Sequence, residues 1–118
     1  MYVNGFVIPV PADKKDAYTK VAEDWWPIAR DHGALSQVEC WEEDVPDGKQ
    51  TDFRRAVGLL PGEKVVFSWV TWPDKATADQ GHDKMMADPR MEAFTLPMPF
   101  DGARMIFGGF SALVVRQA

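Results

Sequence analysis

The residues best suited to chemistry in this sequence are Asp101 and Arg104, which flank a turn at Gly102. A carboxylate and a guanidinium three positions apart can form an ion pair, and the guanidinium could instead bind the carboxylate or phosphate of a ligand. Two interpretations follow. Either Arg104 is a ligand contact that Asp101 orients, or the two residues lock the turn.

His82 and Trp69 are the other candidate site residues. His82 falls on the apolar face of a predicted helix, and histidine suits proton transfer near neutral pH, so it is the candidate catalytic acid or base. A core histidine bonded to a carbonyl is the alternative. Trp69 is one of five tryptophans and is a candidate wall of an aromatic ligand pocket, although core and dimer packing would also explain tryptophans.

Metal and cofactor motifs are absent from the sequence. It contains no glycine-rich phosphate loop, no metal-spaced histidine cluster and no nucleophile elbow. Cys40 is the single cysteine, which rules out an intrachain disulfide and a cysteine-based metal site. We therefore expect no metal and no cofactor, and a reducing, cytoplasmic location.

Charge and hydropathy narrow the possible partners. Lys and Arg total 13 against 18 for Asp and Glu, giving a net charge of -5. Such a chain repels phosphate backbones unless basic residues cluster, and they are scattered, so nucleic acid is disfavoured as a partner. The first residues, MYVNGFVIPVP, include no basic leader and no apolar run long enough for a bilayer, so we expect no membrane association.

The elements that must position these residues follow from hydrophobic periodicity and turn signals. Strands are expected at Tyr2–Val10, Leu35–Glu42, Phe53–Leu60, Lys64–Trp72 and Ala103–Val115; helices at 13–32 and from Asp74, with a short one at Arg90–Phe94. The third and fourth strands would form a hairpin around Pro61-Gly62-Glu63. Asp13, Asp74 and Asp88 are expected helix caps, and Gly33 is expected to end the first helix.

The last predicted strand carries the argument for assembly. Both of its faces are largely apolar, and so are those of the strands at Tyr2–Val10 and Lys64–Trp72. A strand that is apolar on both sides needs cover on both sides. Helices would cover one face and a second subunit the other, so a homodimer is expected. The pair Gly108-Gly109 is expected to mark a bulge, a bend or a close approach of the backbone to its neighbours.

The order of the predicted elements indicates a single α+β domain over residues 1–118. Strand, helix, strand, strand, strand, helix, strand is typical of a ferredoxin-like plait with an antiparallel sheet, helices on one face and one added hairpin arm. Two copies would then pair sheet to sheet in the expected homodimer.

Five segments resemble the YbaA-like family of uncharacterised bacterial proteins, a domain of unknown function. They are MYVNGFVIPVP, HGAL, VVFSW, MADPRM and MPFDGARMIFGGF. The resemblance spans nearly the whole chain. It implies a ferredoxin-like fold of the dimeric αβ-barrel type, and it brings no known activity and no family catalytic residue.

Three functions remain open on the sequence alone. The first is cofactor-free binding or transformation of a small aromatic or acidic metabolite, as an enzyme or as a binding protein, with His82, Arg104, Asp101 and Trp69 as its site. The second is a non-catalytic dimeric interaction module in which these residues are structural. The third, RNA binding, would require a basic surface stripe.

Overall fold

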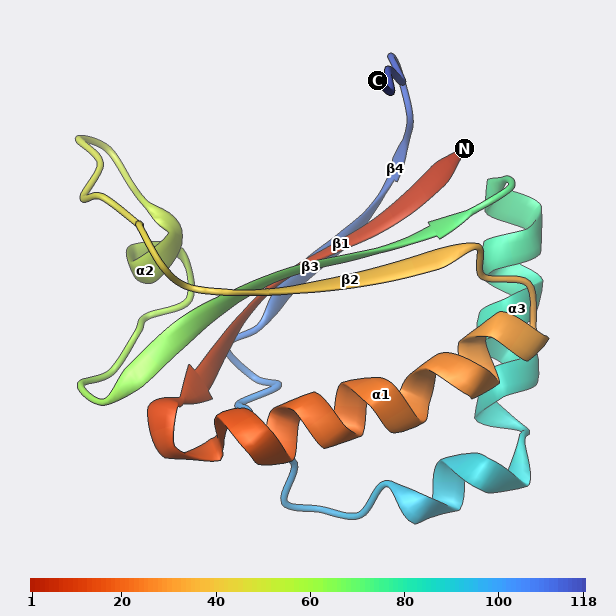
Figure 1. Ribbon diagram of the computed structural model, residues 1–118, viewed down its shortest axis with the longest axis horizontal. Helices are drawn as coiled ribbons and strands as arrows, with labels where there is room; N and C mark the ends of the chain where they lie inside the picture. The colour runs from red at the N-terminus through yellow and green to blue at the C-terminus, as the bar shows by residue number, and fades with distance from the viewer.

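The computed structural model describes residues 1–118 and contains one antiparallel sheet in the order β2-β3-β1-β4, with α1 and α3 on one side of it (Figure 1). The strands are β1 Tyr2–Pro11, β2 Ser36–Trp41, β3 Glu63–Trp72 and β4 Ile106–Ser111. The helices are α1 Lys15–Asp31, α2 Phe53–Ala56 and α3 Lys75–Met86, with 3₁₀ turns η1 Ala12–Lys14 and η2 Pro89–Ala93. This is the ferredoxin-like α+β plait that the sequence predicted.

The register of the central strands decides which side chains face the helices. Phe6 lies opposite Ser68 and Ile8 opposite Val66, and Phe6, Ile8 and Val66 belong to the core beneath the helices. Because strand side chains alternate, the next residues point to the other side of the sheet. We call the two sides the covered face and the open face. The open face carries Val3, Val7, Val38, Phe67, Trp69, Ile106 and Phe110.

Two aspartates begin helices as predicted. The Asp74 side chain accepts a hydrogen bond of 2.7 Å from the Thr77 amide, and Asp88 accepts one of 2.9 Å from the Arg90 amide. Gly33, with a φ of 109°, follows the end of α1, as expected for a left-handed C-terminal position. The third cap was wrong: Asp13 lies in η1, and α1 begins at Lys15 without a side-chain cap.

The predicted strand at Phe53–Leu60 was wrong, and with it the added hairpin arm. Residues Phe53–Ala56 form α2, whose first turn is capped by Asp52 through a 2.7 Å bond from the Arg55 amide. Hydrogen bonds from the Arg55 amide, which contributes most, from the Gly48 amide and from the Arg55 side chain lower the pKa of Asp52 to about 2. A local cap has therefore overridden the strand propensity of FRRAVGLL.

The last strand is shorter than predicted and has no bulge. β4 ends at Ser111, which pairs with Tyr2 at the very start of β1, so the residues after it have no neighbouring strand. Gly108 and Gly109 pair in unbroken register with Gly5 and Asn4. Adding a Cβ to Gly109 would collide with the Tyr2 side chain, so of the three alternatives the close approach is the one that the structure shows.

The hydrophobic core under the helices is divided into two clusters. One contains Trp72 with Ile28 of α1 and Met85 of α3. The other contains Val10 and Tyr18. Phe6 borders both clusters, and opposite Phe6 the sheet presents Ser68, whose small side chain fills little of the space between them.

Candidate functional site

A cavity of about 300 Å³ lies on the covered face between the two core clusters. The sheet, α1 and the segment that follows η2 border it, and Figure 1 shows that segment running alongside α1. Twelve of its fifteen lining residues are hydrophobic: Phe6, Ile8, Tyr18, Val21, Ala22, Trp25, Val70, Met91, Phe94, Met98, Phe100 and Met105. The three polar ones are Gln37, Glu39 and Ser68.

Glu39 is oriented at the mouth of this cavity by two neighbours. The buried Tyr18 hydroxyl donates to its Oε1, and the Gln37 amide nitrogen lies 3.2 Å from its Oε2. The same Gln37 nitrogen donates to the Ala22 carbonyl of α1 at 3.2 Å. Both carboxylate oxygens are thus held in place while the residue itself is solvent-exposed.

The Tyr18 hydroxyl is a fixed donor. Burial is the main cause that raises the pKa of Tyr18 far above its ordinary value. The hydrogen bond to Glu39 and the charge of Glu39 raise it further. Tyr18 therefore stays protonated throughout the physiological range. Its ring packs edge-on against Phe100, with the centroids 6.0 Å apart, which further limits rotation of the side chain.

Glu39 differs from two other glutamates near the sheet. Glu42 accepts from Arg54 at 2.7 Å, and Glu63 accepts from Arg104 at 2.6 Å. Those two carboxylates are neutralised by guanidinium groups, whereas Tyr18 and Gln37 are uncharged donors. The charge on Glu39 is therefore available to a molecule in the cavity.

A second cavity, of about 340 Å³, lies on the other side of the Tyr18–Glu39 pair and shares Tyr18, Ala22, Gln37 and Glu39 with the first. It is bordered by Lys15, whose ammonium sits over the Trp41 ring at 5.3 Å from the centroid. Glu39 therefore stands between two hollows. We call the first of them, which is the more apolar, the inner cavity.

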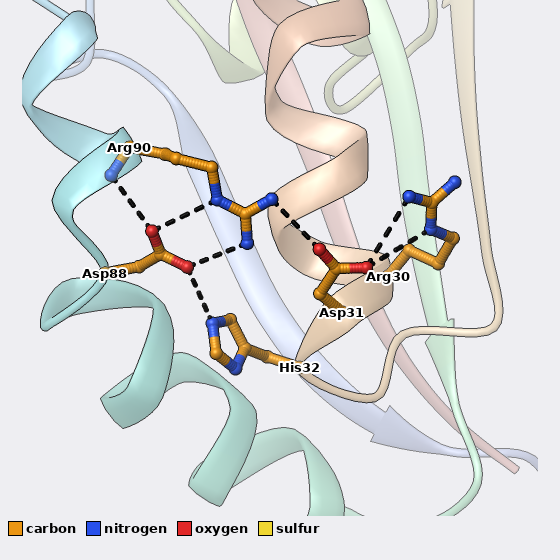
Figure 2. A network of polar contacts seen from close by, with 5 residues as sticks. All are labelled: Arg30, Asp31, His32, Asp88 and Arg90. Carbon is orange, nitrogen blue, oxygen red and sulfur yellow. Dashed lines mark hydrogen bonds and ion pairs between the residues drawn. The ribbon is translucent and has the colours of Figure 1, made fainter.

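A polar network fixes one wall of the inner cavity (Figure 2). The Arg90 guanidinium forms ion pairs with the Asp88 carboxylate at 2.8 Å and with the Asp31 carboxylate at 2.9 Å. The His32 Nε2 lies 2.9 Å from the Asp88 carboxylate. These contacts attach the start of η2 to the end of α1, beside the lining residue Met91. Hydrogen bonds from Arg90 first and His32 second hold the pKa of Asp88 well below its ordinary value.

Asp101 and Arg104 are brought together, as the sequence predicted, but outside the cavity. The Arg104 Nε donates to Asp101 at 2.7 Å, and its two terminal nitrogens donate to Glu63 at 2.8 and 2.6 Å. A further bond of 3.0 Å reaches the Gly58 carbonyl. The guanidinium is thus satisfied within the protein, and it attaches the turn that precedes β4 to the start of β3. Its contact with a ligand stays a prediction.

His82 and Trp69 lie apart from that pair and from each other. The His82 ring packs edge-on against Trp72, with the centroids 5.1 Å apart, on the covered face and outside the lining of the inner cavity. Trp69 lies on the open face beside Phe67, with a centroid separation of 5.5 Å. The four predicted site residues therefore share no single site, and their functional roles remain untested predictions.

The sequence analysis missed Tyr18, Gln37 and Glu39. The available signal was alternation: in β2 the polar pair shares a face with Trp41, while Val38 and Cys40 share the other. An edge strand that turns its polar side toward the helices is unusual, and it marks the mouth of the cavity.

No group of three or more His, Cys, Asp or Glu side chains is arranged to hold a metal ion. None of the helices has both the length and the apolar character needed to cross a membrane.

The fold and the cavity define a ferredoxin-like αβ-plait protein with a small, apolar hollow between helix and sheet. Residues 1–102 match the protein family of unknown function DUF1428, and the chain belongs to this family. It is 56% identical over 113 residues to the uncharacterised protein YbaA of Escherichia coli K12, covering 96% of this chain and 97% of YbaA. YbaA of Shigella flexneri matches equally well. The predicted family resemblance is confirmed, and these relatives are bacterial.

Two solved structures are similar in fold. A NIPSNAP domain protein from Burkholderia xenovorans gives a TM-score of 0.59 at 17% identity, with both chains covered over 100% of their length. The protein Atu4242 from Agrobacterium tumefaciens gives 0.56 at 18% identity, covering 94% of this chain and 92% of that one. At such identities the likeness concerns the fold alone.

Proposed function

We propose that this chain binds a small, largely apolar molecule, such as a single or fused aromatic ring, in the inner cavity and without a cofactor. The observation that carries the proposal is the divided core. Between the two buried clusters the covered face leaves a solvent-open hollow of about 300 Å³ that is lined mostly by hydrophobic side chains. That volume is at the lower end for ligand pockets, which favours a small metabolite.

The lining favours an aromatic ligand over an acidic one. Trp25, Phe94 and Phe100 border the hollow, with methionines that can adapt to a ring. The carboxylate at its mouth is Glu39, whose charge would repel an anionic ligand. The acidic-metabolite part of the sequence-based hypothesis is therefore the weaker part.

Fluorescence of phenylnaphthylamine, a neutral probe that brightens in apolar sites, tests the proposal. Ala22→Phe would place a ring at the cavity, because Ala22 lines it. Ala76→Phe is the matched control, since Ala76 is an exposed residue of α3. We expect the wild type and Ala76→Phe to bind alike, and Ala22→Phe to bind about tenfold more weakly. Equal binding by all three proteins, or no binding by the wild type, would overturn the proposal.

A second function, assembly through the open face, is supported by a separate observation. Phe67 is 46% exposed, Ile106 45% and Phe110 63%, all on the side of the sheet without α1 and α3. A single-domain protein rarely leaves so contiguous an apolar surface in water. A second copy of the chain would cover it sheet to sheet, giving the predicted cytoplasmic homodimer. RNA binding gains no support from the net charge of -5.

A further inference from the structure

We infer that Glu39 is the recognition group of the inner cavity, and that its ligand is a neutral ring compound bearing an O–H or N–H donor, such as a phenol. The inference rests on the proposed binding function and specifies its ligand class. It begins from the hydrogen-bond capacity of Glu39. A carboxylate offers about four acceptor sites, and Tyr18 and Gln37 occupy one on each oxygen. Each oxygen therefore keeps one acceptor site.

The two protein donors make Glu39 a prepared acceptor rather than a mobile surface carboxylate. Tyr18 is buried, with 7% of its surface exposed, and Gln37 is itself anchored to α1 through the Ala22 carbonyl. The cost of ordering the side chain is thus met before any ligand arrives. A surface carboxylate with no such supports would lose conformational entropy on binding.

The charge on Glu39 decides which donors are selected. Neither of its partners carries a charge, so a ligand donor would form a charge-assisted hydrogen bond, which is stronger than one between neutral groups. An anion of similar shape would instead bring a second negative charge to the mouth. No Lys or Arg lines the inner cavity, and Lys15, which lines the second cavity, is held over Trp41.

The cavity provides the complementary apolar part of the site. Behind Glu39 the hollow is lined by hydrophobic side chains, with Ser68 as the one other polar group besides Gln37. A molecule with an apolar ring and one polar end would place the ring inward and its O–H or N–H group outward at Glu39. Ligands that are polar all round would leave groups without partners inside.

Naphthol, its methyl ether and naphthoate form a suitable set of probes. They share the ring and differ in offering a donor, no donor or a negative charge. Binding would be measured by calorimetry on the full chain. We expect the ratio of the methyl ether Kd to the naphthol Kd to fall about tenfold in Glu39→Gln relative to wild type. Naphthoate should bind the wild type at least about tenfold more weakly than naphthol.

Two further variants locate the effect. Glu23→Gln makes the same chemical change at an exposed glutamate of α1 that borders only the second cavity, and it should leave the ratio unchanged. Tyr18→Phe removes the orienting hydroxyl and should lower the ratio part of the way, which a merely structural role would not do. A ratio that is unaffected by Glu39→Gln, or lowered by Glu23→Gln instead, would overturn the inference.

The experiment also separates the two levels of the argument. If the wild type and Glu39→Gln each bind naphthol and its methyl ether with equal affinity, the cavity binds rings but Glu39 does not select the donor. In that case only the inference fails. If the wild type binds none of the probes, the proposed binding function fails, and the inference fails with it.

Discussion

The two faces of the sheet use the same strands for different purposes. On the covered face of β3, Ser68, Val70 and Trp72 lie under the helices, with Trp72 fully buried. On the open face, Phe67 remains 46% exposed although it is next to Ser68 in the chain. The large apolar residue is therefore on the uncovered side and the small polar residue on the covered side.

This inversion agrees with the two proposed functions. A protein that only needed a closed core would place the bulkier residue under the helices, because burial of apolar area is the main stabilising term. Ser68 instead leaves room for the cavity, and Phe67 contributes to an apolar surface. On the proposed functions, the covered face binds the ligand and the open face contacts a second copy of the chain.

The largest expected contrast is between two tryptophans of β3. Trp72→Ala should lower the free energy of unfolding by about 3–5 kcal/mol, because the ring is buried and its Nε1 donates to Asn4 at 2.8 Å. Trp69→Ala, on the open face, should cost the isolated subunit less than half as much. Urea denaturation of both variants at low protein concentration measures this. Equal losses would mean that the open face is as well packed as the covered one.

The next contrast tests what covers the open face. Phe67→Glu would place a charge in a sheet-to-sheet interface and should weaken dimerisation by about a hundredfold. Met86→Glu is the control, since Met86 is 79% exposed on α3 and should leave the dimer unchanged. Sedimentation equilibrium of both proteins gives the answer. A wild-type protein that sediments as a monomer would remove the homodimer proposal.

A smaller effect concerns the cavity wall. Asp88→Asn weakens the network that attaches η2 to α1 (Figure 2), so amide exchange in residues 89–94 should quicken by about tenfold. Asp83→Asn, at an exposed position of α3, is the control. Unchanged exchange in the Asp88 variant would show that the packing of Met91 and Phe94, not the network, holds the wall.

The smallest effect is acid sensitivity at the edge of the open face, where α2 packs Phe53 against Phe67 with centroids 5.8 Å apart. The folded-state pKa of Asp52 is lowered to about 2 from an ordinary value of about 3.9. Its stabilising contribution is therefore complete above the ordinary value and is lost as pH falls toward 2. Fluorescence-monitored unfolding between those limits should show a shallower acid loss in Asp52→Asn than in the wild type. Parallel curves would contradict this account.

Much of the fold could be predicted because its signals are local. Asp74 and Asp88 cap helices through contacts two or three residues away. The strand at Lys64–Trp72 is predicted by its branched and aromatic residues. The prediction of a strand at Phe53–Leu60 was wrong because the Asp52 cap stabilises a helical turn against the strand propensity of these residues. The predicted length of the last strand was wrong because a strand extends only as far as the neighbour it pairs with. The end of β4 is therefore set by where β1 begins.

The candidate site was harder to predict than the fold. Tyr18 and Glu39 are 21 positions apart, and nothing in either local sequence indicates that they meet. Asp101 and Arg104 were found because three residues separate them, but the third partner, Glu63, lies 41 positions from Arg104. Contacts between distant segments depend on how helices lie across the sheet, which periodicity alone does not fix.

The sequence by itself determined most of the element types, the ferredoxin-like order and the presence of strands that are apolar on both sides, because these follow from propensity, alternation and capping within a few residues. Only the tertiary structure decided which apolar face is covered, that the core divides around Ser68, and that Tyr18 and Gln37 orient Glu39 at the mouth of the resulting cavity. These features arise where side chains from separate segments meet, and their geometry is set by packing rather than by local sequence.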